Sequence, residues 1–539
     1  MKRLIVSLSL VLLLAVVLVP AASAKSFRYG VTAGEVTSSG AVLWTRADRS
    51  GPVTLLVARD KRFRKARRTY KLRASSSSDK TVQRKVRGLA AHARYYYLFL
   101  QRKGRRSTRG TFRTAPRSSA NATIRFAWSG DTDAIPLKGQ KKPYWNNFDI
   151  FRRMQRERND FNVHFGDTIY SDSEVPGRAS PVALTRKQKW GKYKINLGQA
   201  NLRRLRASGA FYSHWDDHEF VNDFARGENK FGGGTGADRY TVSRNGQTIY
   251  RDGVRAFRDY APVSYTSKDG LYRSRRWGRN LEVFFLDQRS FRSPKASANG
   301  VCNNPSTGQP DLAPTGPTGT RNLFGAIVPS LRQPVSPACT AAINSPNRTF
   351  LGKRQYSRFT RAVKASKARF KVIMNELPIQ QYYVLPYDRW EGYEFERKRL
   401  LNYLKDNVKN VVFLTTDVHA TLVNDARLQT LEQGGPVNSG IADVTVGPAA
   451  TENFEDEVDG AVGKGNGRLV DDVFLENPPP AGVGMPCSSV KAFSYGEVKV
   501  TSSTLTITPK DIRGGRLQQD PSGPSKTTAC GPFVLAYKG

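Results

Sequence analysis

Residues 161–170 read Phe-Asn-Val-His-Phe-Gly-Asp-Thr-Ile-Tyr, and this stretch decides the fold. Its first half, residues 161–165, is the pattern of a buried strand, and Gly166-Asp167 follows at once. Upstream, residues 123–128 form a second strand-like run, and a helical pattern near 145–158 separates the two. Strands that alternate with helices predict an α/β core.

Other strand-like runs further along the chain also end in polar side chains. The candidates at strand ends are Asp131 and Asp133, Asp167 and Tyr170, the segment 213–219, Asp287 and Arg289, Asn375, and Asp417 and His419. In open α/β folds the ligand lies beyond the carboxyl ends of the strands. Six strands that end in carboxylate, amide or imidazole groups therefore predict one shared site.

The histidines point to the same site. The chain has five, and His164, His214, His218 and His419 lie in or next to these strand ends. Oxygen-rich sites with a few imidazoles suit hard or borderline divalent metals, or ferric iron. Two such ions could clamp the attacking and leaving oxygens of a phosphoryl transfer.

The composition limits the class of protein. Of 539 residues, 39% are hydrophobic, which is enough for a sizeable core and excludes a wholly disordered chain. The formal charge of +41 comes from 86 Lys or Arg against 45 Asp or Glu, and it favours anionic partners. The open possibilities are cell-wall polymer, a membrane surface and nucleic acid.

The chain begins like an exported protein. Lys2-Arg3, an apolar run and Ala22-Ser23-Ala24 predict a signal peptide at residues 1–24. No later stretch is apolar enough to span a bilayer, so together with the signal peptide we expect a secreted or cell-envelope protein. We also expect a monomer.

Export permits disulfides between the four cysteines. We expect the pairs Cys302–Cys339 and Cys487–Cys530, because each closes a loop rich in Pro, Gly and Ser. The Pro/Gly/Ser/Thr-rich residues at about 295–349 predict an inserted surface loop.

Residues 25–115 predict a separate β-rich domain, a small sandwich of the fibronectin type III kind. Residues 25–114 carry 24 Lys or Arg against 4 Asp or Glu. Two interpretations stay open for this basic module: a solvated face, or an electrostatic tether to an anionic polymer. The core domain is expected over residues 122–520.

The motifs resemble those of PhoD-like alkaline phosphatases, within the calcineurin-like metallophosphoesterases. The matching segments are residues 29–36, 41–46, 164–170, 215–219, 286–292, 390–393 and 414–419. The run Trp215-Asp216-Asp217-His218-Glu219 is the most specific of them.

The resemblance implies a four-layer α/β/β/α metallophosphatase core behind the front sandwich. It implies two or more metal ions, with Mn, Zn, Fe and Ca all open. The implied metal ligands are Asp131, Asp167, Asp217, Asp417 and His419, with Asn375 as a looser match. Asp133 and Tyr170 are further candidate metal ligands from their places at strand ends, with other roles open: Tyr170 could instead belong to the core, and Asp133 could support a ligand or lie on the surface. His218 is implied as the proton donor to the leaving group, and Arg289 is a candidate phosphate clamp on chemical grounds.

Two positions depart from the family pattern. Residues 129–133, Ser-Gly-Asp-Thr-Asp, hold no cysteine or tyrosine where well-known members hold ferric iron. Glu391 stands where an aspartate often precedes Gly-Tyr. The acidic run at 452–459 has two open interpretations, a calcium site and a solvated loop.

The resulting hypothesis is a secreted metal-dependent phosphatase in which a metal-activated water attacks phosphorus. One alternative is a phosphodiesterase or phospholipase that acts on teichoic acid, phospholipid or nucleic acid. The alternative of another class is a basic polyanion-binding surface protein with a vestigial site.

Overall fold

The computed structural model describes residues 26–177, 181–234, 238–519 and 529–539. The expected signal peptide at residues 1–24 lies outside the described residues. Within the described part, no helix combines the length and the apolar character that a membrane crossing requires.

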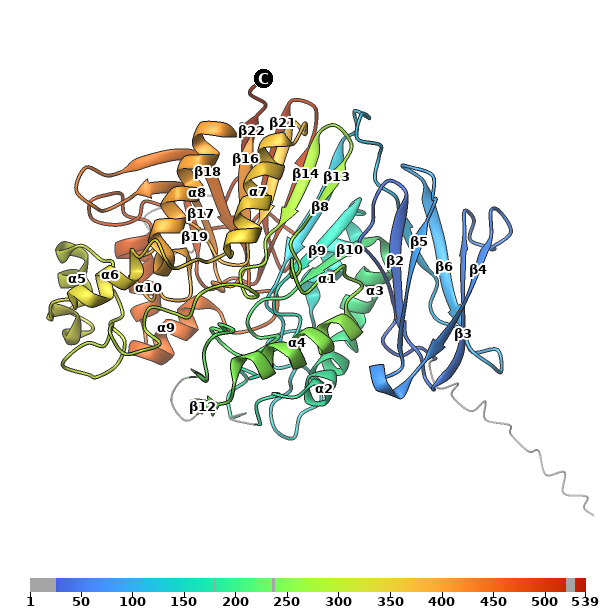
Figure 1. Ribbon diagram of the computed structural model, residues 1–539, viewed down its shortest axis with the longest axis horizontal. Coiled ribbons are helices and arrows are strands. Elements are labelled where there is room, and N and C mark those ends of the chain that lie inside the picture. The colour runs from blue at the N-terminus through green and yellow to red at the C-terminus, as the bar shows by residue number, and fades with distance from the viewer. Residues whose placement is uncertain (1–25, 178–180, 235–237, 520–528) are drawn as a thin grey trace, which may run out of the picture.

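Two large sheets form the centre of the molecule (Figure 1). The nine-stranded sheet has the spatial order β22 (Phe533–Ala536), β21 (Thr504–Asp511), β20 (Ser494–Val500), β8 (Ile124–Ser129), β9 (Phe161–Phe165), β10 (Ala210–His214), β1 (Val31–Gly34), β2 (Gly40–Arg46), β5 (Thr81–Arg87). The seven-stranded sheet has the order β13 (Arg273–Trp277), β14 (Leu281–Phe285), β15 (Phe370–Met374), β16 (Val411–Thr415), β18 (Val437–Thr445), β17 (Thr421–Gln429), β19 (Cys487–Ser489). The neighbours β8, β9 and β10 are parallel, as are β14, β15, β16 and β18.

Alternation along the strands places one apolar core between the sheets. In β9, Phe161, Val163 and Phe165 belong to this core, and successive side chains of a strand point to opposite faces. In β15, Phe370 and Val372 belong to the same core, whereas Ile373 packs into the cluster outside the sheet.

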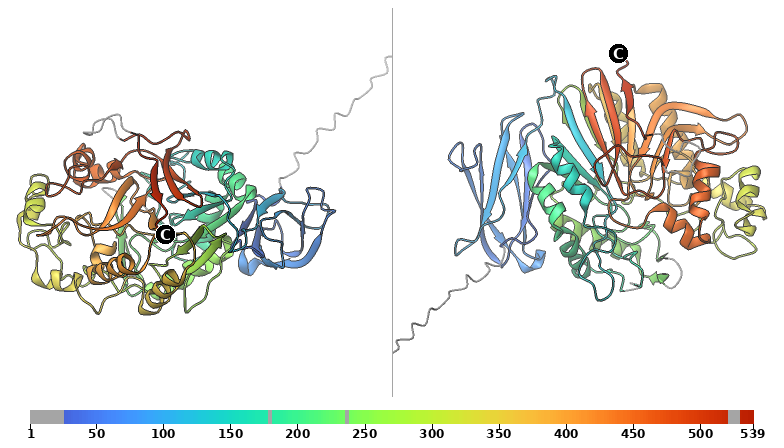
Figure 2. Two further views of the ribbon diagram at one scale, coloured as in Figure 1. Left: turned by 90° about the horizontal axis from the view of Figure 1, so that it is seen from above. Right: turned by 180° about the vertical axis from the view of Figure 1, so that it is seen from behind.

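Helices cover both outer faces and complete an α/β/β/α arrangement, which confirms the predicted fold class (Figures 1 and 2). On the nine-stranded sheet these are α1 (Asp149–Arg156), α2 (Arg186–Leu197), α3 (Ala200–Ser208) and α4 (Gly246–Tyr260). On the seven-stranded sheet they are α7 (Lys353–Ala365) and α8 (Glu394–Asn407).

The front module is a β-sandwich, but it shares a sheet with the core. Its outer sheet has the order β4 (Arg68–Ala74), β3 (Gly51–Ala58), β6 (Arg94–Leu100), β7 (Gly110–Arg113). Its inner sheet is β1, β2 and β5, and β1 joins core strand β10 through the parallel pair Ala33↔Ala210. One apolar cluster accordingly includes Leu55 and Tyr97 of the module and Phe161 of the core. The inner sheet of the module is therefore continuous with the core sheet.

Both predicted disulfides are present, Cys302–Cys339 and Cys487–Cys530. The first lies in the insertion at 295–349, which also contains the short helices α5 (Thr318–Phe324) and α6 (Pro337–Ile343). Further small elements are α9 (Phe454–Val462), α10 (Asn466–Val470) and the hairpin of β11 (Lys230–Gly233) and β12 (Tyr240–Ser243). The prediction of a loop at 452–459 is wrong for most of that run: α9 begins there, and the Asn453 side chain caps it by accepting from the Asp456 N–H.

Candidate metal centre

The site residues lie on short loops that follow core strands at one edge of the sheets. Asp131 follows β8, Asp167 follows β9, and Asp417 and His419 follow β16. All four have left-handed backbone conformations, with φ of 59° at Asp131, 49° at Asp167, 73° at Asp417 and 58° at His419. This conformation is uncommon outside glycine and is typical of functional loops that the surrounding structure holds in place.

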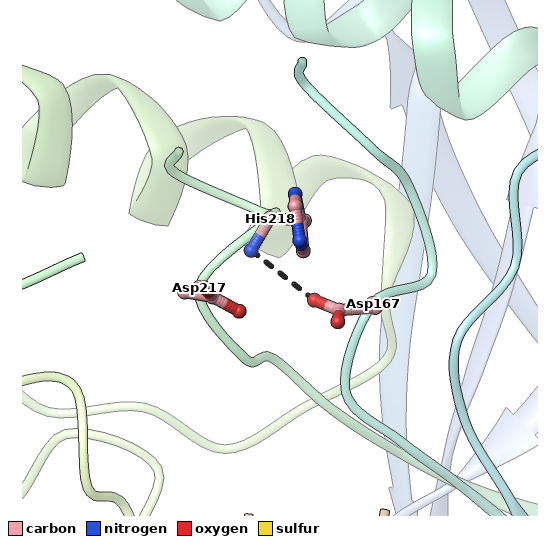
Figure 3. Close-up of side chains that lie close together, drawn as sticks. All are labelled: Asp167, Asp217 and His218. Carbon is pink, nitrogen blue, oxygen red and sulfur yellow. Dashed lines mark hydrogen bonds between the residues drawn. The ribbon is translucent and has the colours of Figure 1, made fainter. Parts of the chain in front are cut away.

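Carboxylates and an imidazole converge into three overlapping groups at this edge. Asp167, Asp217 and His218 form one, and their side chains face one another (Figure 3). The other two are Asp216, Asp217, Asp417 and Asp217, Asp223, Asp388. Within each group the potential ligand atoms all lie within 4.8 Å of one another. Asp217 belongs to all three, so it is the centre of the cluster.

The chemistry of these donors fits a cation. Asp131 Oδ2, Asp216 Oδ2, Asp217 Oδ1 and His419 Nδ1 are buried and make no hydrogen bond with any described residue. Burial and then neighbouring carboxylates raise the pKa of Asp131, Asp167 and Asp417 well above the usual aspartate range. Buried carboxylates that repel one another and lack donors are stabilised when they coordinate a metal.

His218 is held between acidic groups beside this cluster. Its backbone N–H donates to Asp167 Oδ1 at 3.1 Å, and its ring Nδ1 lies 2.7 Å from Asp172 Oδ1. Burial lowers the pKa of His218, but Asp172, Asp217 and Asp167 more than offset burial and raise that pKa well above its usual value. The ring stacks on Tyr170 with centroids 4.0 Å apart. The imidazole is therefore positioned to carry a proton.

Tyr170 and His419 contact each other next to the cluster. The Tyr170 hydroxyl and His419 Nε2 are 2.8 Å apart, and both side chains are buried. Burial, followed by the charge of His218, lowers the pKa of His419 to about 3. His419 is thus neutral, the form in which an imidazole binds metal.

Arg289 occupies a different place from the one expected of a phosphate clamp. The whole residue is buried, with 0% of its surface exposed. Its Nε contacts Asp216, and its Nη1 lies 2.7 Å from Asp388 Oδ2. Its Nη2 lies 3.4 Å from Asp417 and 3.5 Å from Asp217. The guanidinium therefore compensates four carboxylates, and no face of it is open to a substrate.

Five expected metal ligands lie outside the three groups: Asp131, Asp133, Tyr170, Asn375 and His419. Asn375 and Asp133 are engaged by other residues. Asn375 Oδ1 accepts from Gln288 Nε2 and from Trp390 Nε1, so its amide oxygen is already used. Asp133 accepts from the Ile135 N–H and from Ser173 Oγ. Both shape the loops behind the cluster in this structure.

Sequence reasoning missed Asp223 and Asp388, which complete the third group. Neither follows a strand directly, so the strand-end pattern does not identify them. The sequence analysis considered Glu391, at the position where an aspartate often precedes Gly-Tyr. The Glu391 carboxylate instead accepts from the Tyr383 N–H at 2.6 Å and pairs with Arg389. Asp388, three residues earlier, is the acid that reaches the site.

Glu219 belongs to the predicted segment 213–219, but its role was not predicted: it fixes the geometry of two site loops. Its carboxylate accepts from the backbone N–H groups of Asp167 at 3.0 Å, Thr168 at 2.7 Å and Asp216 at 2.8 Å. Burial raises the pKa of Glu219 to about 8. Glu219 is a positioning residue, because it binds the backbone that carries the ligands.

We expect Glu219→Ala to lower the free energy of unfolding by about 2–4 kcal/mol, since three buried N–H groups lose their acceptor. Glu219→Gln keeps one side-chain oxygen as an acceptor, so its free energy of unfolding should fall by less. Urea unfolding of the metal-stripped variants measures both. Equal stability of Glu219→Ala and the unmodified protein would show that these hydrogen bonds do not hold the loops.

Comparison with known proteins places this geometry in context. Residues 137–502 match the family model described as PhoD-like phosphatase, and residues 15–116 match the model of its N-terminal domain. Alkaline phosphatase D of Bacillus subtilis (strain 168) is 26% identical over 443 residues, which cover 75% of this chain and 66% of that relative.

Solved structures agree at the level of the fold. A structure of PhoD superposes with a TM-score of 0.68 at 20% identity and covers 96% of this chain and 90% of its own. The purple acid phosphatase PPD1 from yellow lupin (Lupinus luteus) seeds superposes with a TM-score of 0.54 at 11% identity, over 91% of this chain and 73% of its own.

Proposed function

Because the chain belongs to the PhoD-like phosphatase family, we propose that it is a metal-dependent hydrolase of phosphate esters. The observation that carries the proposal is the buried carboxylate cluster around Asp217, in which Asp131 Oδ2, Asp216 Oδ2 and Asp217 Oδ1 accept no hydrogen bond from any described residue. A vestigial site would be expected to lose such costly groups, and this cluster retains them.

The residues that would hold metal ions are Asp131, Asp167, Asp216, Asp217, Asp223, Asp388, Asp417 and His419. Tyr170 is a further candidate through its contact with His419. More than one ion is consistent with three overlapping groups, and carboxylate-rich donors suit Mn, Zn, Fe or Ca. Bound there, such ions would lower the pKa of water and offset the charge of the phosphoryl group.

The protein's own residues supply proton transfer and order. In the charged imidazole of His218, Nδ1–H faces Asp172, and Nε2, which lies 3.6 Å from Glu174 Oε1, would donate its proton to the departing ester oxygen. Glu219 fixes the loops of Asp167 and Asp216, and Arg289 holds Asp216, Asp217, Asp388 and Asp417 together before a cation arrives. In the overall reaction a P–O bond to water forms, the P–O ester bond breaks, and the leaving oxygen takes the proton.

The basic front module supports a second part of the proposal, contact with an anionic surface. In strand β4 the side chains of Arg68, Lys71 and Arg73 are exposed. Residues 25–114 hold 24 basic against 4 acidic residues, so the field around the module attracts polyanions. We propose export to the cell envelope, which agrees with two disulfides in the described chain.

Hydrolysis of a nitrophenyl phosphomonoester and of a nitrophenyl phosphodiester tests the activity and its class. Metal-stripped protein is assayed alone and with Mn, Zn, Fe or Ca, beside Asp167→Ala. Metal-restored turnover that the variant lacks is expected, and the ratio of the two rates assigns monoesterase or diesterase. Folded protein that turns over neither substrate with any of these metals would favour the polyanion-binding alternative.

A further inference from the structure

An apolar pocket of about 200 Å³ is lined in part by the insertion and in part by residues next in sequence to those of the metal centre. Its walls come from residues 312–331, residues 382–389, the segment after β16, helix α9 and residues 470–475. Representative lining side chains are Phe324, Leu331, Val384, Val418, Phe454 and Phe474. Apolar cavities of roughly 150 Å³ in proteins stay dry and accept hydrocarbon rings.

Three walls of this pocket continue directly into the metal centre. Val418 lines the pocket, and its sequence neighbours Asp417 and His419 belong to the centre. Phe454 at the start of α9 lines the pocket, and its backbone N–H donates to the His419 carbonyl at 3.0 Å. Arg389 lines the third wall, one residue after Asp388.

Exposed apolar side chains lie on three of the segments that form the pocket. Leu385, which lines the pocket, is 52% exposed. Leu323 on α5 is 41% exposed and Leu469 on α10 is 40% exposed, and both are sequence neighbours of lining residues. Leu385 therefore presents exposed apolar surface at the pocket, and Leu323 and Leu469 are exposed on two further segments that contribute to its walls.

We propose that this pocket holds the hydrocarbon chain of an amphiphilic phosphate ester whose phosphate lies at the metal centre. This inference rests on the proposed function and names its substrate class. Three walls of the pocket lead along the chain to residues of the metal centre, so the apolar pocket and the phosphate-binding centre are neighbours. An alkyl or acyl phosphate ester has a hydrocarbon chain for the first and a phosphate for the second. The exposed Leu385 at the pocket suits a ligand drawn from a lipid surface. The positive charge of the protein favours an anionic lipid surface.

The lining excludes polar occupants such as polyol phosphates and nucleotides. Its polar side chains are Arg389 and Tyr382. Arg389 donates to Glu391 and to the Val384 carbonyl, and the Tyr382 hydroxyl accepts from Asn424 at 3.2 Å. A sugar or base in the pocket would lose its hydrogen bonds to water without replacement, which is costly.

A series of nitrophenyl phosphodiesters with methyl, butyl and hexyl chains tests the proposal, all kept below micelle concentrations. Full burial of one methylene favours binding about fourfold. With half of that gain realised, kcat/KM should rise roughly 30-fold from the methyl to the hexyl ester. The nitrophenyl group is common to all members, so it cancels from the comparison.

Ala461→Trp localises the effect. Ala461 lines the pocket from the exposed side of α9, near the end of the helix, so an indole can enter the pocket at small cost to folding. We expect this variant to hydrolyse the methyl ester as before and to lose the gain with chain length. Ala365→Trp, an exposed alanine at the end of α7, is the matched control and should keep the gain.

Calorimetric binding of methyl and hexyl phosphate separates this inference from the proposed function, because it needs no turnover. Tighter binding of hexyl phosphate that Ala461→Trp removes supports the pocket even if no ester is hydrolysed. Hydrolysis that does not depend on chain length, together with equal binding of the two phosphates, overturns the pocket and leaves the phosphatase intact. A chain-length gain that survives in Ala461→Trp overturns its assignment to this pocket.

Discussion

Asp217→Asn should abolish phosphate-ester hydrolysis while leaving the metal-free protein folded and no less stable. Asp217 is shared by all three groups of potential ligands, so its replacement weakens every one of them. We expect kcat/KM to fall by at least about 10³-fold, which corresponds to roughly 4 kcal/mol of transition-state stabilisation. Removal of one buried negative charge from a crowd of carboxylates relieves repulsion, so the free energy of unfolding of the metal-free variant should stay equal or rise.

Asp443→Asn is the matched control for this variant. Asp443 is a buried aspartate of β18 outside the centre, and it accepts from the backbone N–H groups of Ile379 at 2.8 Å and Gln380 at 3.0 Å. Its replacement should lower the free energy of unfolding by about 1–3 kcal/mol and leave metal binding intact. If Asp217→Asn instead loses stability as Asp443→Asn does, Asp217 has a structural role and not the one assigned to it.

Arg289→Met should destabilise the metal-free protein by about 3–5 kcal/mol, because it leaves buried carboxylates without their compensating charge. Burial alone would lower the pKa of Arg289, but Asp216, Asp217, Asp388 and Asp417 raise it well above its usual value. A bound cation supplies the missing positive charge, so added metal should recover part of the lost stability. Thermal unfolding with and without metal measures both effects.

Arg397→Met is the control for Arg289→Met. Arg397 is equally buried. It donates to the Ile379 carbonyl at 2.7 Å and pairs with Glu394 at 3.0 Å. Neither Ile379 nor Glu394 belongs to the three groups of potential ligands. Its loss of stability should be the same with and without metal. If added metal restores no more stability to Arg289→Met than to Arg397→Met, the guanidinium of Arg289 does not take the place of a metal cation in the metal-free protein.

The core could be predicted from the sequence because its strands have a clear pattern. Runs such as residues 161–165 and 411–414 are apolar and are followed at once by Asp167 and by Asp417. Parallel strands bring such ends to one edge of a sheet, so the convergence of these acids followed from topology alone. The motif at residues 215–219, which follows β10, supplied Asp217 in the same way.

The positions of residues on irregular loops could not be predicted from strand patterns. Asp388 enters the site from a loop well after β15, and no periodic pattern fixes where such a loop lies. The partners of Arg289 and Asn375 depend on which side chains fill the space around them, and composition does not encode that. The continuity of the front module with the core sheet rests on the single pair Ala33↔Ala210, which local sequence patterns do not reveal.

The central claim is that the cluster around Asp217 is a metal centre that hydrolyses phosphate esters. Titration of metal-stripped protein with Mn, Zn, Fe or Ca tests it most directly, with bound metal and nitrophenyl phosphate ester hydrolysis followed in the same samples. The account predicts that at least one of these metals binds stoichiometrically, that activity rises with its occupancy, and that Asp217→Asn shows neither. Folded protein that binds none of these metals, or that hydrolyses the ester equally well without metal, would contradict it.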